Sequence, residues 1–454
     1  MTASPPTPPA GSGAASVGPL AGVRVLEFTT AWAGPFAGRC LAYLGADVIK
    51  VEAPGHPDSW RGPRSGGAPI YYPESTPGPD PQNSNMLFNS QNIDKRSIGL
   101  DLKQPGAMDV MHDLVRRSDV LLANFTPGVL DRLGVGRRDL ARVNDRIIVV
   151  EMPAFGDGGP SSSHQGMGKT MEPAAGMTSL MGYPDGTPVL TGPAIMDPTG
   201  GLNAVAAVVS ALELRERTGH GAGVVVPQVE AAASWIGEYI LEQVETGSTW
   251  VPDGNHVADA VPHGAYPCAG DDEWIAIAVQ DDSQWRALCA ALGAHDLADD
   301  PAFHRFPDRR TAEELLDDVL AELTRAHDKT TLADRLQAAG VPAAPVLGGG
   351  EIAGSPAMRE CGMLVDLDHA AVGRRTYSAL GFRHSRSAGS HRRAAPLFGE
   401  HNDEVLRNLL GYDAEDLAAL RGAGAVADAP TADTDTPHVS RVDPVAAARE
   451  EARS

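Results

Sequence analysis

The sequence predicts an α/β protein, with a doubly wound parallel sheet in a large domain and a smaller α+β domain after it. Three observations predict this class: a strand–helix–strand pattern over 23–52, further alternation of helices and strands up to about residue 152, and a change of pattern near residue 255. A strand, a helix and a strand within about 30 residues form a βαβ unit with parallel strands and a right-handed crossover. The 454 residues, 42% of them hydrophobic, are enough for two or three domains with substantial cores.

The opening βαβ unit is the clearest pattern in the chain. Val23–Phe28 is a largely apolar run of strand length, Phe36–Leu44 has the length of a short helix that ends at Gly45, and Ala46–Glu52 repeats the strand pattern. The alternation continues with predicted helices at 106–118, 130–133, 197–217 and 230–246 and predicted strands at 98–102, 119–124 and 146–152. Because parallel strands need crossover connections, these elements predict a Rossmann-like sheet.

The pattern after residue 255 indicates a different local architecture. Two strand-like segments, 264–268 and 274–279, are joined by the short turn Ala-Gly-Asp-Asp, which is typical of a hairpin. Helices are predicted after the hairpin, over 283–292, 311–326 and 332–339. A hairpin followed by helices predicts a small α+β domain.

These patterns set the expected domain boundaries. We expect the large domain to span 19–250 and to be completed by about 346–420, with the small domain at 251–345. Residues 1–18 and 423–454 contain few large side chains and are rich in Ala, Pro and Thr. Such composition cannot build a core, so both segments are predicted to be disordered tails.

The charge balance and the absence of targeting patterns exclude several protein classes. Lys and Arg number 37 against 59 Asp and Glu, a formal net charge of −22, which disfavours a nucleic-acid binder because such proteins need a basic surface. The first residues lack the pattern of a signal peptide, and the chain has no apolar run of about 18 residues, so no membrane segment is expected. The four scattered cysteines favour reduced thiols in a cytoplasmic protein.

Common catalytic and cofactor motifs are absent. The turn after the first strand lacks the G-x-G-x-x-G pattern of dinucleotide-binding proteins. Gly168-Lys169-Thr170 imitates the end of a P-loop, but Ser163 stands where that motif needs its first glycine. There is no H-E-x-x-H pattern, no Cys/His cluster and no G-x-S-x-G elbow, so neither a metal site nor a serine hydrolase is predicted.

Three segments remain as candidates for chemistry. The loop Thr29–Pro35 follows a strand and opens a helix, where ligands collect in open α/β sheets; the alternative is a turn in which Trp32 packs on the sheet. The basic pair Lys95 and Arg96 suits a phosphate, but such a pair is more often a solvated turn. Glu172 is an isolated acid in a Gly-rich, nearly uncharged run, which fits either a reactive carboxylate or a hydrogen-bonded structural one.

Five blocks of the sequence together resemble one family, the family III CoA-transferases, which include formyl-CoA and carnitine CoA-transferases. The first block is PLAGVRVLEFTTAWAGPFAGRCLAYLGADVIKVEAPGHPD at 19–58, and the others lie at 94–107, 118–136, 197–223 and 262–279. The blocks are long and follow the family's order from residue 19 to about residue 410. The resemblance implies a doubly wound large domain, a small α+β domain and two subunits threaded through each other as interlocked rings.

The resemblance also implies a substrate and a binding site. The expected substrates are an acyl-CoA and a small carboxylic acid; no permanently bound cofactor is expected, since coenzyme A is itself a substrate. With Arg96 added from the basic pair, the expected CoA-binding residues are Thr30, Ala31, Trp32, Ala33, Lys50, Ala53, Lys95, Arg96, Asn124, Phe125 and Arg132.

The family mechanism uses an aspartate that this chain lacks. In the family, an Asp carboxylate attacks the acyl-CoA thioester and forms a mixed anhydride and then an enzyme–CoA thioester, which is nucleophilic catalysis. The family's Asp position corresponds to Gly168, and no Asp occurs between Asp157 and Asp185. Val225 and Pro227 also replace residues that are usually Asp and Ser in the family.

Three interpretations follow from this departure. In the first, Glu172, one helical turn after Gly168, supplies the missing carboxylate. In the second, the chain is a catalytically degenerate CoA-binding subunit that pairs with an active homologue, so that the oligomer is a homodimer or a heterodimer with a paralogue. The third is an acyl-CoA racemase or isomerase that uses His164, but that branch of the family needs the same missing Asp.

Overall fold

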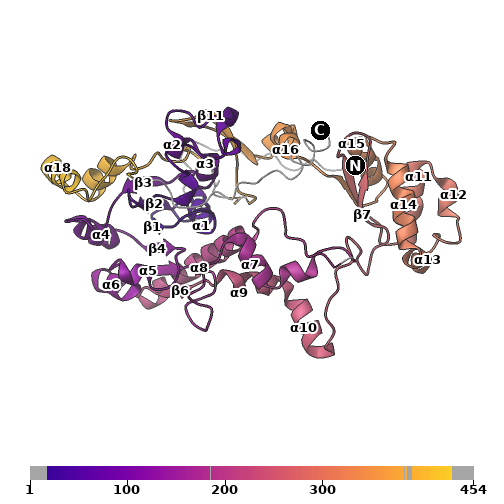
Figure 1. Ribbon diagram of the computed structural model, residues 1–454, viewed down its shortest axis with the longest axis horizontal. Coiled ribbons are helices and arrows are strands. Elements are labelled where there is room, and N and C mark those ends of the chain that lie inside the picture. The colour runs from indigo at the N-terminus through magenta and orange to yellow at the C-terminus, as the bar shows by residue number, and fades with distance from the viewer. Residues whose placement is uncertain (1–17, 185, 383, 386–390, 432–454) are drawn as a thin grey trace, which may run out of the picture. The chain divides into compact units, whose positions relative to one another are not determined.

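The computed structural model describes residues 18–184, 186–382, 384–385 and 391–431, and the chain divides into two units (Figure 1). The larger unit is built from the chain up to Met177, from Leu190–Leu241 and from Arg359 onward. The smaller unit consists of Thr178–Val189 and Glu242–Met358. The predicted small domain, 251–345, lies inside the second of these stretches, and the sequence held no signal for the first.

The larger unit contains a six-stranded parallel sheet in the order β3-β2-β1-β4-β5-β6. Its strands are β1 (Arg24–Phe28), β2 (Asp47–Glu52), β3 (Arg96–Gly99), β4 (Val120–Ala123), β5 (Ile148–Glu151) and β6 (Gly223–Val225). The chain moves outward from β1 to β3, then returns to the other side of β1 and moves outward again. This reversal confirms the predicted doubly wound sheet and places its switch point between β1 and β4.

Helices cover both faces of this sheet. One face packs α1 (Ala33–Tyr43) and α8 (Met196–Thr218) over the apolar side chains of the central strands. The other face packs α4 (Ala107–Arg116), α5 (Val129–Arg132), α6 (Arg137–Val143) and α18 (Ala414–Gly422). Helix α1 stops where predicted, since Gly45 adopts a left-handed φ of 100°.

The larger unit contains several further elements, some of which the sequence did not predict. They are α2 (Pro81–Ser84), α3 (Met86–Gln91), α7 (Gly168–Ala174), α9 (Gln228–Ala233), the 3-10 turn η5 (Ser234–Ile236), β10 (Leu364–His369), β11 (Gly373–Ser378) and the π-helix η6 (Glu404–Leu409), while α10 (Gly237–Thr246) runs past the end of the unit. The helix predicted over 230–246 is therefore broken at the 3-10 turn. There the Ser234 hydroxyl donates to the carbonyl of Ala231 at 2.7 Å and competes with the helical ladder. Strand β3 begins at Arg96, which was predicted to lie in a loop.

The predicted tails lie mostly outside the described residues, since 1–17 and 432–454 are not described. Within the described part, the prediction does not hold for 423–431. Ala425 and Val426 are buried against α4 and α18. The Ala427 N–H donates to the carbonyl of Gly99 at 3.1 Å, so this segment continues the edge of the sheet. Backbone hydrogen bonds and small apolar side chains order it despite its tail-like composition.

The smaller unit has its own core around an antiparallel sheet. The strands are β7 (His263–Pro267), β8 (Trp274–Ala278) and β9 (Ala343–Pro345), and the helices are α11 (Asp282–Leu292), α12 (His295–Ala298), α13 (Phe306–Thr311), α14 (Glu313–Thr324), α15 (Lys329–Ala338) and α16 (Gly349–Gly354), with α17 (Pro356–Glu360) at its boundary. Trp285 and Leu320 are wholly buried between helices and sheet. The predicted hairpin and the helices after it are confirmed.

Candidate active site

Two loops meet at the switch point of the large sheet, where β1 and β4 end. The Thr30 N–H donates to Oδ1 of Asn124 at 2.9 Å, and Nδ2 of Asn124 donates to the carbonyl of Thr30 at 2.8 Å. These reciprocal bonds tie the two loops together. Ligands of doubly wound proteins bind in the crevice outside these strand ends, so two of the residues predicted from the sequence stand at the expected place.

A third loop, after β2, clamps the first one. Oδ1 of Asp58 accepts hydrogen bonds from the N–H groups of Ala31 and Trp60, both at 2.9 Å. Ala31 has a φ of 63°, a left-handed conformation that is unusual for a residue with a side chain. The surrounding hydrogen bonds hold this strained turn in place, and the rings of Trp32 and Trp60 lie 5.7 Å apart beside it.

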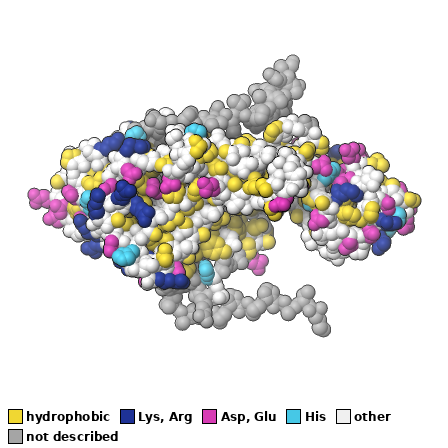
Figure 2. Space-filling model, turned by 90° about the horizontal axis from the view of Figure 1, so that it is seen from below, with side chains coloured by type: hydrophobic (Ala, Val, Ile, Leu, Met, Phe, Trp, Pro, Cys, Tyr) yellow, Lys and Arg dark blue, Asp and Glu magenta, His cyan; other side chains and the backbone are white. Residues whose placement is uncertain are grey.

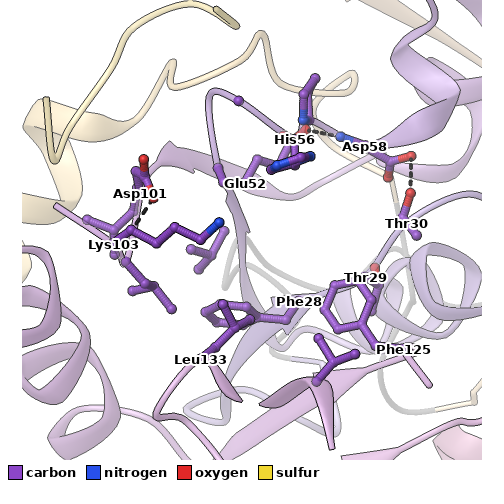
Figure 3. A pocket seen from close by; sticks show the side chains of 17 residues that line it. Phe28, Thr29, Thr30, Glu52, His56, Asp58, Asp101, Lys103, Phe125 and Leu133 are labelled. Carbon is purple, nitrogen blue, oxygen red and sulfur yellow. Dashed lines mark hydrogen bonds between the residues drawn. The ribbon is translucent and has the colours of Figure 1, made fainter. Parts of the chain in front are cut away.

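A cavity of about 470 Å³ opens at these strand ends (Figure 3). Its apolar wall comes from Phe28, Val51, Leu100, Leu102, Phe125, Val129 and Leu133. His56, Asp101 and Lys103 form a polar rim, with the exposed side chain of Lys103 reaching over the cavity from the loop after β3. An apolar cleft with a few polar groups at its edge is the usual form of a small-molecule site.

The cavity contains only some of the residues predicted for CoA. Thr30, Ala53 and Phe125 line it. Arg132 is exposed on α5, directly before the lining residue Leu133. Phe28, His56, Lys103 and Leu133 were not singled out from the sequence, although each lies at or just after the end of a strand or helix that the sequence predicted.

Lys50 and Lys95 do not fit the predicted role of CoA-binding residues, because both are buried and paired inside the protein. Nζ of Lys95 lies 2.8 Å from Oε2 of Glu27 and donates to Oδ1 of Asn92 at 2.8 Å. Nζ of Lys50 lies 3.1 Å from Oε1 of Glu27 and 2.8 Å from Oδ2 of Asp58. Both ammonium groups also donate to carbonyls shortly after β1, Lys50 to that of Thr29 and Lys95 to that of Pro35 in the first turn of α1, and neither is exposed to the cavity.

The charges of this cluster shift one another's pKa values. Burial raises the pKa of Glu27, but the attraction of Lys95 and Lys50 outweighs it and leaves that pKa below its usual value. Burial lowers the pKa of Lys95 to about 8, against the opposing attraction of Glu27. For Lys50, the attraction of Asp58 and Glu27 outweighs burial and raises the pKa. Glu27 is thus an anion shared by two buried ammonium groups, and Asp58 adds the larger attraction for Lys50.

Arg96 also does not fit the predicted phosphate role. It lies at the amino end of β3, while the cavity lies at the carboxyl ends of the strands. Its guanidinium donates to both carboxylate oxygens of Asp47, at 2.9 and 2.5 Å, and lies 3.0 Å from Oε1 of Glu404. The basic pair is split because successive side chains of a strand point to opposite sides.

Glu172 is wholly buried on α7 and has both carboxylate oxygens occupied. Oε1 accepts from the Thr191 N–H at 2.8 Å, and Oε2 accepts from the Thr191 hydroxyl at 2.7 Å. This geometry matches the structural alternative for this acid, in which the carboxylate fixes the loop before α8. The role of Glu172 as nucleophile stays a prediction.

Asp197, in the first turn of α8, is a second carboxylate next to α7, and the sequence analysis did not single it out. It is partly exposed, and its carboxylate accepts a hydrogen bond from the Ala33 N–H at the start of α1. A Cβ atom placed on Gly168 would overlap with Oδ2 of Asp197 and with the side chain of Ala194. A side chain at residue 168 would therefore require Asp197 and Ala194 to shift.

The described residues contain neither a metal-binding cluster nor a helix fit to span a membrane. No group of three His, Cys, Asp or Glu side chains in this part of the chain is arranged to hold a metal ion. Of the helices that the structure describes, none has both the length and the apolar character needed to cross a bilayer.

The sheet order and the cavity at the switch point define a doubly wound α/β protein with a cavity where proteins of this fold bind ligands. Within that class, residues 20–402 match the family model of CoA-transferase family III, so the chain belongs to this family. This confirms the resemblance found in the sequence.

The chain is similar to characterised members of that family along most of its length. It is 30% identical over 432 residues to the formyl-CoA:oxalate CoA-transferase of Rhodopseudomonas palustris, covering 90% of this chain and 97% of the relative. It is 30% identical over 406 residues to the succinyl-CoA–D-citramalate CoA-transferase of Chloroflexus aurantiacus, covering 89% and 97%. A CaiB/BaiF family protein from Brucella suis has the same fold, with a TM-score of 0.78 at 28% identity over 87% of this chain and 100% of that one.

Proposed function

We propose that this protein transfers coenzyme A between carboxylic acids through a covalent intermediate on an enzyme carboxyl group. The observation that carries the proposal is the cavity at the switch point, lined by apolar side chains and edged by Lys103, in a chain that matches the CoA-transferase family over residues 20–402. The relatives' names supply the candidate substrates: formyl-CoA with oxalate, and succinyl-CoA with D-citramalate.

The apolar wall and the cationic side chains of the cavity favour one orientation of CoA. The adenine ring is the apolar, flat part of the molecule and suits the wall that holds Phe28 and Phe125. The phosphates suit the cationic rim at Lys103, with Arg132 on the neighbouring helix. The pantetheine arm then follows the loop Thr30–Ala33 toward the first turn of α8.

The proposed orientation makes Lys103 the main phosphate contact of the cavity. Lys103→Ala should raise the Kd of CoA about tenfold in calorimetry, since a charge-assisted hydrogen bond contributes about 1.5–3 kcal/mol and a screened surface one lies at the low end of that range. The matched control is Arg217→Ala, which removes another exposed cation, one in a surface ion pair on α8; the Kd of CoA for this variant should equal that of the wild type. An unchanged Kd for Lys103→Ala would contradict the orientation.

The transfer itself is tested with the relatives' substrates. We expect the protein to convert formyl-CoA and oxalate to oxalyl-CoA and formate, or succinyl-CoA and D-citramalate to succinate and the citramalyl thioester, followed by mass spectrometry of the thioesters. If it binds CoA but exchanges none in either reaction, the second candidate function holds: a non-catalytic CoA-binding subunit. That candidate is favoured by one observation, Gly168 at the family's aspartate position.

The expected oligomer is a dimer with a second copy of this chain. Large hydrophobic side chains stand exposed on the larger unit, including Leu202 and Leu214 of α8 (49% and 51%) and Trp235 of η5 (52%), and Figure 2 shows many such side chains on the face that it presents. Exposed apolar surface of this kind marks an interaction site. Light scattering should give twice the mass of the chain; a monomer that dimerises only on addition of a paralogue would support the heterodimer.

A further inference from the structure

A C-terminal strap, residues 425–431, runs along the edge of the large sheet. Its composition predicted part of a disordered tail, but the structure packs it against the end of β3. The Ala427 N–H donates to the carbonyl of Gly99 at 3.1 Å, and the buried Val426 pairs with Leu100 in an antiparallel bridge. Because Leu100 lines the cavity, the strap lies against the back of a cavity wall.

The strap reaches Lys103 through Asp101. The Asp101 N–H donates to the carbonyl of Ala425 at 2.9 Å, which fixes the backbone at this point. Oδ1 of Asp101 in turn accepts from the Lys103 N–H at 3.1 Å. Both residues line the cavity, and Figure 3 shows the pale yellow C-terminal part of the chain next to their loop. A short series of hydrogen bonds thus leads from the strap to the proposed phosphate contact.

The other end of the strap is attached to the loop after β2. The Thr431 N–H donates to the carbonyl of Pro54 at 2.8 Å, and Nη1 of Arg64 donates to the carbonyl of Thr431 at 3.3 Å. Pro54 stands between Ala53 and Gly55, which both line the cavity. The strap therefore connects two lining loops that follow different strands.

One buried side chain, Asn402, holds the strap on the sheet. Its Oδ1 accepts from the Gly99 N–H at 2.9 Å, and its Nδ2 donates to the carbonyl of Ala427 at 2.9 Å and to Oδ1 of Asp428 at 2.8 Å. Asn402 is only 1% exposed, so water does not replace these bonds if they are lost. A Cβ atom on Gly99 would overlap with the carbonyl oxygen of Ala427, so the two backbones approach as closely as a glycine allows.

We propose that the C-terminal strap is a positioning element of the CoA site, which fixes Lys103 through Asp101 and the loop after β2 through Pro54. The inference rests on the proposed function and names the segment that orders its phosphate-binding edge. None of the strap residues lines the cavity, so the strap acts through the residues it holds. Because a cation that is already ordered loses less conformational freedom on binding, the strap should lower the Kd of CoA without entering the chemical step.

The first test compares two shortened chains. A chain that stops after Thr431 keeps the strap and should bind CoA with the wild-type Kd. A chain that stops after Gly424 lacks the strap, and its Kd in calorimetry should rise about tenfold, as for Lys103→Ala, since both lose one charge-assisted contact. In transfer assays with succinyl-CoA and D-citramalate, the KM for succinyl-CoA should rise by the same factor while kcat stays within about twofold, the pattern of lost uniform binding.

A double-mutant cycle shows whether the strap acts through Lys103. Adding Lys103→Ala to the chain that stops after Gly424 should raise the Kd by less than about twofold more, because the contact is already lost. Independent factors that multiply to about a hundredfold would mean that the strap does not act through this residue. That result overturns the inference.

A point variant tests the strap without shortening the chain. Asn402→Asp can still accept from the Gly99 N–H, but it sets a carboxylate against the carbonyl of Ala427 and against Asp428. It should release the strap and raise the Kd of CoA about tenfold. Adding Asp428→Asn supplies an amide donor to the new carboxylate and should bring the Kd back to within about threefold of the wild type.

Hydrogen exchange tests the same coupling in the unaltered protein. By linkage, if the strap strengthens CoA binding about tenfold, CoA must favour the attached strap by the same factor. The amides of Asp101 and Ala427 should therefore exchange about tenfold more slowly at saturating CoA. This measurement decides the inference if the variants fail to fold in thermal unfolding.

The outcomes separate the inference from the proposed function. A folded chain without the strap that binds CoA with the wild-type Kd overturns the inference, and so does unchanged amide exchange in the strap at saturating CoA. Both results leave CoA transfer intact. A wild-type protein that does not bind CoA overturns the proposed function and the inference with it.

Discussion

Glu27→Gln should destabilise the protein by about 3–5 kcal/mol at pH 7, the cost of breaking a buried ion pair by removing one partner. Glu27 is wholly buried and is the common partner of Lys50 and Lys95, with Nζ to carboxylate distances of 3.1 and 2.8 Å. A glutamine has nearly the same shape but leaves both ammonium groups without their shared anion. The free energy of unfolding, from urea titration followed by circular dichroism, measures the loss.

The loss should become smaller as the pH rises from 7 to 9. The pKa of Lys95 is already lowered to about 8 in the wild type, against an attraction from Glu27 that raises it. Without Glu27 the pKa falls further, so the folded variant releases the Lys95 proton that the unfolded chain keeps until about pH 10.4. The unfolded state then binds more protons, and stability rises with pH in this window. A deficit that grows with pH would contradict this account of the cluster.

A matched control separates this cluster from ordinary surface ion pairs. Glu213→Gln removes one partner of the exposed pair with Arg217, whose charged atoms lie 2.7 Å apart one helical turn away. We expect a change of less than about 0.5 kcal/mol, because exposed pairs are solvated in both states. Equal losses for the two variants would mean that Glu27 does not hold the site's loops as described.

Gly168→Asp should destabilise the protein by about 1–3 kcal/mol through overpacking alone, and by more once two carboxylates share one space. The new side chain would overlap with Oδ2 of Asp197 and with Ala194. Restoring the family's residue is thus expected to harm this protein rather than improve it. Thermal unfolding and the transfer rate both measure the effect.

The double variant Gly168→Asp with Asp197→Gly distinguishes shared space from a general intolerance of residue 168. It removes the obstructing carboxylate as it adds the new one, so it should recover about 1–3 kcal/mol relative to the sum of the single changes. Gly158→Asp is the control, because nothing lies within 4 Å of a Cβ at that exposed glycine and its stability should not change. Additive losses in the double variant would show that the two positions do not compete.

The fold was predictable because its pattern is local. The alternation of apolar strands with helices up to residue 152 was enough for the doubly wound sheet, and the hairpin at 263–278 for the small unit. The errors fall where local pattern is weak. Strand β6 has three residues, and the order of 423–431 depends on backbone pairing with Gly99, a residue far away in the chain.

The candidate site was predictable in position but not in the role of each residue. Thr30, Ala53 and Phe125 line the cavity because they follow predicted strands, and the carboxyl ends of parallel strands lie at one edge of the sheet. The direction of a charged side chain was not predictable. Lys50 and Lys95 turn inward because Glu27 on β1 offers a buried anion, and no local pattern reveals this pairing.

The sequence by itself determined the family, the parallel sheet and the edge of the sheet at which the cavity lies, because each follows from contiguous blocks of residues and from the order of the strands. Only the tertiary structure decided which charged side chains line the cavity and which are buried and paired beneath it. Gly168 and Asp197 lie on different helices, and a side chain at residue 168 would overlap with the carboxylate of Asp197. Whether two side chains can share one space depends on how helices pack, which no single segment of sequence contains.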